Sequence, residues 1–269
     1  MNRSPTNFIR EILREAQRRV PAGQRTVQEA FTAEHGRPVR VKLNELLPDT
    51  FYLFDEFTAC AFREAVLDWA TRHGKGRVTV SCSAFGEFQA QRRRFEHVAG
   101  RVESLRVLAV GTPERFAAKG GGIEVVNTNG GVLAGYRVAL KEGRPGALFL
   151  SREIRSRATD AQRCLGFFSV DAATIDEVAD DLDAVLNGRA RAVLSFERLK
   201  LLHQTTQRVT RELASYSRRM ELAIRRAQRR PDLLTPARFD RIVRQSILKM
   251  EELKDIPRRA LRTLGQNHW

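Results

Sequence analysis

Polar side chains stand at the ends of several short apolar runs in this 269-residue chain. If those runs are strands of one sheet, the polar side chains can converge at one rim of it. Guanidinium groups bind carboxylates and phosphates through paired donors, so such a cluster would suit an anionic ligand. The alternative is a set of structural ion pairs, such as Glu153 with Arg163 or Arg92. The candidate ligand-binding residues are Arg92, Arg93, Tyr136, Arg152, Glu153 and Arg163.

A second set of candidate residues lies in the basic C-terminal region. Residues 187–269 hold 20 Lys and Arg against 8 Asp and Glu, whereas residues 43–186 hold 18 against 20. An excess on this scale suggests a polyanion partner, because a row of arginines can follow a phosphate backbone without reading bases. The alternative is a solvated helix face whose long stems cover apolar neighbours. The candidate nucleic-acid-binding residues are Arg218, Arg219, Arg225, Arg226, Arg229 and Arg230.

Catalytic and metal-binding motifs are not recognisable in the sequence. The five histidines fall in different segments without metal-site spacing, and no GxSxG or phosphate-binding loop is present. Three cysteines without CxxC spacing favour buried, reduced thiols. We therefore expect a protein that is not an enzyme, with no catalytic residues, metal or cofactor. An enzyme would require distant residues to assemble a site that a single sequence does not reveal.

The apolar runs predict a sheet covered on both faces. They are four to six residues long, rich in β-branched and aromatic residues, and bounded by Gly, Pro or Asn. Because they are apolar at nearly every position, we expect helices above and below. The segments 78–82, 85–98 and 105–110 predict a strand–helix–strand crossover, which makes the two strands parallel and opens their carboxyl ends to ligands. The other predicted strands are 123–126, 136–140, 147–150 and 165–170.

Helical periodicity and capping residues predict the flanking elements. Apolar residues at spacings of three and four indicate a helix over 6–20, and Thr26 can cap a second helix that extends to about residue 34. Residues 39–43 alternate like an edge strand. The aromatic residues Phe51, Tyr52, Phe54 and Phe57 are expected to lead into a helix that ends at Gly74. Asp171 can cap a helix that ends near Asn187.

The C-terminal part of the chain predicts a helical hairpin. From about residue 190 to 230, apolar residues recur at alternating spacings of three and four over more than three heptads, which is a coiled-coil seam. Pro231 ends this helix, and Thr235 can cap a second one with a matching stripe. A long heptad seam favours self-association, so we expect a homodimer through these helices.

The central region resembles the DICT sensory domain, a module of bacterial signalling proteins that stands beside diguanylate cyclase and two-component output domains. The resemblance covers roughly residues 52–188 and consists of a series of motifs. A basic-aromatic helix at 92–95 runs into the "VLA" strand 107–109. Leu148-Phe-Leu-Ser-Arg-Glu153 resembles the family's "xLxxRE" strand end, and RCLGFFSVD at 163–171 resembles its "RxFxGxxTxD" segment. Arg137-Val-Ala-Leu140 resembles a strand that usually opens with Glu-Trp, where this chain has Gly135-Tyr136.

These observations combine into one expected organisation. The fold class is α/β, with a mixed central sheet covered by helices, N-terminal helices and a long C-terminal helical hairpin. Residues 1–50 form an N-terminal helical segment, residues 51–188 a DICT-like sensory domain, and residues 189–269 a basic helical hairpin. No apolar run is long enough to cross a bilayer and residues 1–21 do not resemble a secretory signal, so we expect a cytoplasmic protein without membrane contact.

Two functions fit this organisation. The resemblance implies a non-enzymatic regulator that senses an unknown signal and relays it through the dimerising hairpin to a signalling output protein. The charge distribution supports a nucleic-acid-binding protein that uses the basic C-terminal helices on the phosphate backbone of DNA. The two are compatible, since a sensor can act by moving a DNA-binding element.

Overall fold

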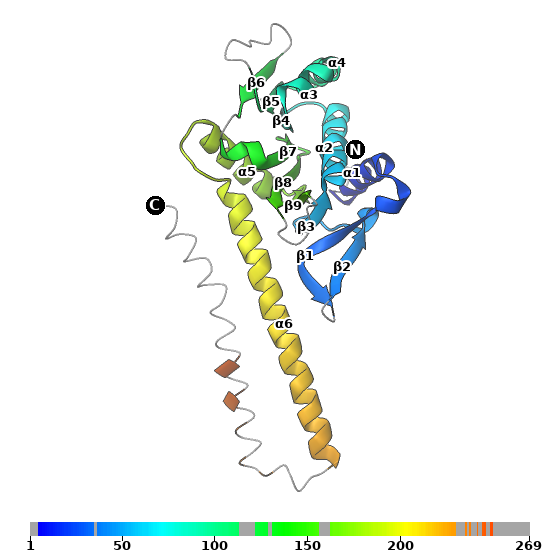
Figure 1. The fold of residues 1–269 in the computed structure, drawn as a ribbon, viewed down its shortest axis with the longest axis vertical. Helices are drawn as coiled ribbons and strands as arrows, with labels where there is room; N and C mark the ends of the chain where they lie inside the picture. Colours follow the sequence, from blue (N-terminus) through cyan, green and yellow to red (C-terminus); the bar gives the residue numbers. More distant parts are fainter. Residues whose placement is uncertain are drawn as a thin grey trace. The chain divides into compact units, whose positions relative to one another are not determined.

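The computed structural model describes residues 5–34, 37–112, 122–128, 131–155 and 162–229, together with isolated positions from 235 to 249. The chain divides into two compact units, residues 1–196 and residues 197–269 (Figure 1). The first unit is built on a sheet that also includes residues 26–34 and 37–42, so the segment before residue 50 belongs to the same unit as the central region.

One mixed, nine-stranded sheet contains the strands in the described part of the chain. Its order is β2-β1-β3-β9-β8-β7-β4-β5-β6. The strands β4, β5 and β6 are parallel to one another, and every other neighbouring pair is antiparallel. The strands are β1 (Thr26–Glu34), β2 (Arg37–Lys42), β3 (Tyr52–Asp55), β4 (Arg77–Cys82), β5 (Ser104–Ala109), β6 (Ile123–Asn127), β7 (Tyr136–Lys141), β8 (Ala147–Arg155) and β9 (Gln162–Ser169).

The predicted mixed sheet is confirmed, whereas the predicted helix after Thr26 was wrong. Residues 26–34 form the strand β1 and not a helix, because pairing with β2 and β3 satisfies their backbone groups on both sides and overrides weak helix propensity. The chain bulges at Phe31, whose φ is 63°. Residues 52–55, within the aromatic cluster, form the strand β3, which was not predicted.

Helices cover both faces of the sheet. Helix α1 (Pro5–Arg19) buries Ile12, Leu13 and Ala16 in the core, as its spacing predicted. It packs beside α2 (Glu56–His73), which begins where Asp55 accepts a hydrogen bond from the Thr58 amide at 2.7 Å. The predicted helix 85–98 is interrupted at residue 91, giving the short helices α3 (Phe85–Ala90) and α4 (Arg92–Ala99).

The opposite face of the sheet carries α5 and the start of α6. Helix α5 (Ala172–Leu186) is capped by Asp171, which accepts from the Thr174 amide at 2.9 Å, as predicted. Helix α6 (Leu194–Arg229) has 36 residues, and its first-turn Phe196 is buried against Phe51 and Phe167. The second predicted helix, from residue 235 onward, lies outside the described residues apart from isolated positions. Among the helices described, none combines the length and apolarity needed to cross a membrane.

Candidate functional site

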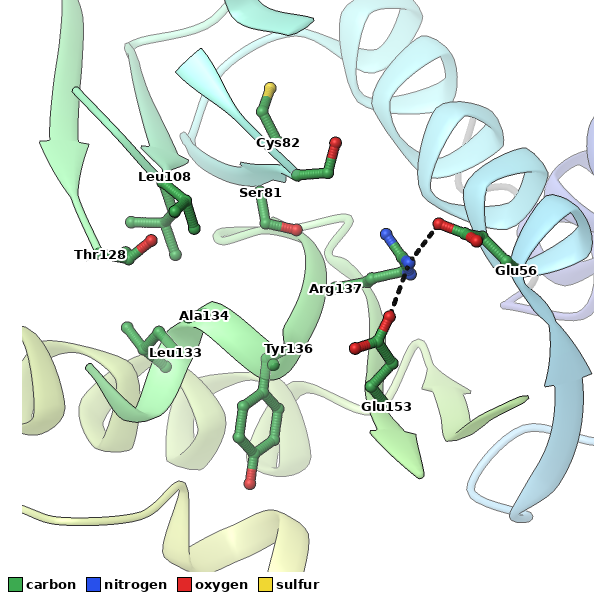
Figure 2. A pocket seen from close by; sticks show the side chains of 13 residues that line it. Glu56, Ser81, Cys82, Leu108, Thr128, Leu133, Ala134, Tyr136, Arg137 and Glu153 are labelled. Atoms are coloured by element: carbon green, nitrogen blue, oxygen red, sulfur yellow. Dashed lines mark hydrogen bonds and ion pairs between the residues drawn. The ribbon is translucent and has the colours of Figure 1, made fainter. Parts of the chain in front are cut away.

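A pocket of about 270 Å³ opens at the edge of the sheet where the parallel strands end (Figure 2). The sheet register brings the carboxyl ends of β4 and β8 to the same edge as the first residues of β7. Cys82 and Glu153 therefore meet Tyr136 and Arg137 around one opening, and the first residue of α2, Glu56, completes it. Ligands of α/β sheets bind beyond the carboxyl ends of parallel strands, so this pocket is the candidate functional site.

Arg137 is the central charged group of the pocket. Its side chain is only 11 % exposed, and its Nη2 donates to Glu56 Oε1 at 2.7 Å and to Glu153 Oε1 at 3.4 Å. Figure 2 shows the two carboxylates on either side of the guanidinium. Burial lowers the pKa of Arg137, but Cys164, Cys60 and Glu56 together raise it above the ordinary value. Arg137 is therefore a fixed positive charge, with its field already opposed by two carboxylates.

Tyr136 lies next to Arg137 in sequence, but its side chain points to the other face of the sheet. Successive residues of a strand point to opposite faces, so Arg137 meets α2 while the Tyr136 ring meets the start of α6. The Tyr136 and Phe196 ring centroids are 5.5 Å apart and nearly perpendicular. Arg152, paired with Tyr136 in the register of β7 and β8, places its guanidinium 5.5 Å from the Tyr136 ring centroid. A residue of the pocket wall thus contacts the first turn of α6.

Groups of the pocket that could act as nucleophiles are engaged or protonated. Ser81 Oγ accepts from the Val138 amide at 2.8 Å. Ser83 Oγ donates to Glu87 Oε2 at 2.8 Å. Burial, with a smaller contribution from Glu87, raises the pKa of Cys82 to about 12, so its thiol is protonated at neutral pH. This arrangement suits binding better than nucleophilic catalysis.

Comparisons of the chain with protein-family models, with curated proteins and with solved structures find no match. Among the described residues, no group of three or more His, Cys, Asp and Glu side chains is placed to hold a metal ion.

The predicted ligand-binding residues meet only in part. Tyr136 and Glu153 line the pocket, and Arg152 lies over the Tyr136 ring. Arg163 pairs in register with Ile154, which places it on the other face from Glu153, and its Nη1 donates to Gln28 Oε1 at 3.4 Å. The suggested ion pair of Glu153 with Arg163 is thus replaced by Glu153 with Arg137.

Arg92 and Arg93 do not belong to the pocket. Both are exposed on α4, where Arg92 Nε donates to Glu96 Oε1 at 2.9 Å. Arg137 and Glu56, which do belong, were not selected from the sequence. Two signals could have found them, because Arg137 is the charged residue inside the apolar run 136–140 and Glu56 follows the helix-capping Asp55.

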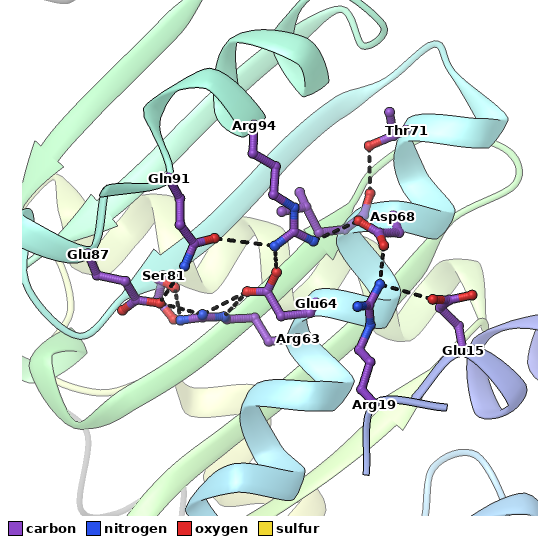
Figure 3. Close-up of polar contacts among 11 residues, drawn as sticks. Glu15, Arg19, Arg63, Glu64, Asp68, Thr71, Ser81, Glu87, Gln91 and Arg94 are labelled. Carbon is purple, nitrogen blue, oxygen red and sulfur yellow. Dashed lines mark hydrogen bonds and ion pairs between the residues drawn. The ribbon is translucent and has the colours of Figure 1, made fainter. Parts of the chain in front are cut away.

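A separate charge network joins the helices on the α1 and α2 face (Figure 3). At its centre Arg63, 3 % exposed, donates to the Ser81 carbonyl at 2.7 Å and to Glu87 Oε1 at 2.5 Å. Burial acts to raise the pKa of Glu87, but Arg63 and the Ser83 donors lower it overall. Arg94, and not its neighbours Arg92 and Arg93, joins this network. The further members are Glu15, Arg19, Glu64, Asp68 and Gln91.

The predicted nucleic-acid-binding arginines that are described lie exposed on α6. They are Arg218, Arg219, Arg225 and Arg229. Arg225 forms an ion pair with Glu221 in which both side chains are more than half exposed, a type of pair that contributes little. The side chain of Arg226, and Arg230 as a whole, lie outside the described residues.

Proposed function

We propose that residues 1–196 form a cytoplasmic sensory module that binds a small polar molecule in the pocket at the carboxyl edge of the sheet. In this proposal the protein is a non-enzymatic regulator similar to the DICT sensory domains. The observation that carries the proposal is the pocket around Arg137, where strand ends, the start of α2 and a buried guanidinium meet. Pockets with a few converging polar groups at strand ends are the usual ligand sites of α/β folds.

Contact between Tyr136 and Phe196 supports a relay from this pocket to α6. Phe196 has no exposed surface and stands in the first turn of α6, three residues after the equally buried Val193. The Ser195 amide in the same turn donates to Asp181 on α5. A ligand that shifts Tyr136 would press on this anchored turn, and a continuous helix of 36 residues transmits a displacement at its start along its length.

The pocket-binding step predicts a specific result for a plugging variant. Gly135 lines the pocket, and a Cβ added there would meet no atom within 4 Å, so Gly135→Phe fills open space without backbone strain. In a thermal-shift screen of small metabolites, we expect at least one compound to raise the Tm of the wild type by several degrees but not that of Gly135→Phe.

Gly23→Phe is the matched control, because a Cβ there is equally unhindered and lies outside the pocket. It should respond as the wild type does. Equal responses of the wild type and Gly135→Phe to every stabilising compound would contradict the proposed site.

The output step of the proposal is a homodimer formed through α6, which passes the change to a signalling partner. Large apolar side chains on α6 remain accessible in the single chain, with Leu213 41 % and Ile224 52 % exposed. Both lie on the same helix face, 11 residues apart. We expect multi-angle light scattering of the concentrated protein to give twice the mass of the chain. A purely monomeric protein would contradict this step.

A second candidate function is DNA binding by α6, favoured by its exposed arginines. Arg218, Arg225 and Arg229 recur on one helix face, and the segment carries a large excess of positive charge. We expect duplex DNA to bind with an affinity that falls steeply with salt. Changing Arg218, Arg225 and Arg229 together to Gln should lower the salt slope by about 2–3, because each lost phosphate contact reduces it by about 0.9.

Arg10→Gln, Arg40→Gln and Arg101→Gln combined are the matched control, since they remove the same charge from exposed positions of the first unit. This control should leave the salt slope nearly unchanged. An electrophoretic shift assay at several salt concentrations measures the DNA affinity of both variants. If wild type gives no mobility shift at low salt, DNA binding is contradicted.

A further inference from the structure

The pocket lies where two neighbouring strands of the sheet separate. Strands β4 and β7 are paired as far as Val80 and Ala139, although β4 continues to residue 82 and β7 begins at residue 136. Beyond that pair a side chain takes over from the backbone, because Ser81 Oγ accepts from the Val138 amide at 2.8 Å and donates to the Val138 carbonyl at 3.5 Å. The opening beyond Ser81 is therefore a gap between two strand ends.

Three polar groups around this gap keep hydrogen-bonding capacity within the described part of the chain. Arg137 uses Nη2 for both of its carboxylates and its Nε is buried, whereas Nη1 donates to no oxygen of a described residue. Glu56 accepts through Oε1 and its side chain is 51 % exposed, so its Oε2 stays available. The Thr128 hydroxyl, directly after β6, forms no hydrogen bond with a described residue. Figure 2 shows Arg137 and Thr128 on opposite sides of the opening.

The charges beside the pocket are already balanced. Glu56 and Glu153 are negative, whereas Arg137 and Arg152 are positive. Arg152 holds its guanidinium over the Tyr136 ring, and Glu153 already contacts Arg137. A charged ligand would leave one sign in excess at a half-buried site, which costs more free energy than placing a neutral ligand there. The balance favours a neutral ligand, contrary to the anionic ligand expected from the arginines in the sequence.

We propose, resting on the ligand site proposed above, that the ligand is a neutral cyclic amide whose carbonyl accepts from Arg137 and whose N–H donates to Glu56. An amide presents an acceptor beside a donor, which complements a guanidinium nitrogen beside a carboxylate oxygen. A flat ring suits the volume of about 270 Å³ and packs against the buried Leu108 and Leu133. Its far edge reaches the Thr128 hydroxyl, and no contact with Glu153 is needed.

Four probes that share one ring test this ligand class by isothermal titration calorimetry. Uracil is neutral and carries N–H groups beside its carbonyls, and 1,3-dimethyluracil keeps the carbonyls without the N–H groups. Orotate is the anionic carboxylate of the same ring, and 5-(aminomethyl)uracil is cationic. We expect wild type to bind uracil at least about tenfold more tightly than each of the others. No heat from uracil up to about 10 mM, or tighter binding of another probe, would overturn the proposal.

Variants that keep size or charge test the individual contacts. Thr128→Val removes only the hydroxyl and should weaken uracil binding about three- to tenfold. Arg137→Lys keeps the positive charge but has a single nitrogen, which the two carboxylates occupy, and should weaken it about tenfold.

The matched controls are a threonine and an arginine of the same sheet outside the pocket. Thr79→Val changes a buried threonine of β4. Arg106→Lys changes an arginine of β5 that, like Arg137, lies between two carboxylates. Both should bind uracil as wild type does. Equal uracil binding by Thr128→Val, Arg137→Lys and these controls would overturn the proposal.

The plugging variant separates a wrong ligand class from a wrong site. If wild type binds orotate or 5-(aminomethyl)uracil more tightly than uracil and Gly135→Phe loses that binding, the neutral amide is wrong and the pocket stands. If Gly135→Phe binds uracil as wild type does, uracil binds elsewhere and the proposal fails.

Discussion

Replacing Phe196 with alanine is expected to lower the free energy of unfolding of the first unit by about 3–5 kcal/mol. Phe196 has no exposed surface, and its ring lies 5.4 Å from the Phe51 ring and 5.5 Å from the Tyr136 ring, centroid to centroid. Removing it leaves a cavity among aromatic side chains that the surrounding sheet cannot close. Urea unfolding followed by circular dichroism measures the change.

Phe57→Ala is the control for this prediction. Phe57 is a phenylalanine of the same unit, 52 % exposed at the start of α2, and its loss should change stability by less than about 0.5 kcal/mol. Phe196→Leu, which keeps the site filled, should lose much less stability than Phe196→Ala and so allows the relay to be studied in a folded protein. Equal stability of Phe196→Ala and wild type would show that the first turn of α6 is not anchored in the core.

Replacing Arg63 with methionine is expected to cost about 3–5 kcal/mol, because it leaves the partly buried Glu87 without its cation and removes one of the two arginines that pair with Glu64. Arg63 Nη2 donates to Glu64 Oε1 at 2.7 Å and to Glu87 Oε1 at 2.5 Å, and the two carboxylates are 14 % and 22 % exposed. The matched control is the exposed Arg72, whose Nη2 lies 4.0 Å from Glu15 Oε2. Arg72→Met should lower the free energy of unfolding by less than about 1 kcal/mol.

The cost of Arg63→Met should also depend on pH. The pKa of Glu87 is lower in the folded protein than its ordinary value of 4.5, so its ionised form contributes stability above that value, and the contribution is lost as pH falls through the folded pKa. Without Arg63 the main cause of this lowering is absent. The difference between wild type and Arg63→Met should therefore shrink below about pH 4.5. A difference that grows on acidification would contradict the role assigned to Arg63.

The sequence predicted the sheet best where local pattern and tertiary structure agree. The apolar runs 136–140 and 147–150 are buried on both faces and became β7 and β8, and the capping role of Asp171 was confirmed. Residues 26–34 were predicted wrongly because their apolar and polar residues alternate poorly. Their pairing with the next strand, β2, and with β3, which begins at residue 52, makes them a strand.

The site was less predictable than the fold. Glu153 and Tyr136 could be placed at a strand end from the sequence, but whether a charged side chain meets its neighbour depends on which sheet face it occupies. The register of β7, β8 and β9 decides the face. It places Arg137 on the same face as Glu153 and Arg163 on the opposite face. The ring contact of Tyr136 with Phe196 joins residues 60 positions apart and has no local signature.

Hydrogen–deuterium exchange tests the central claim, that a ligand bound in the pocket changes the amide protection of the first turn of α6. The measurement compares wild type and Gly135→Phe, each with and without a compound that stabilises wild type in the thermal-shift screen. The account predicts slower exchange in wild type at both residues 131–137 and residues 193–198, and no change in Gly135→Phe. Slower exchange at the pocket alone, or the same protection in both proteins, would contradict it.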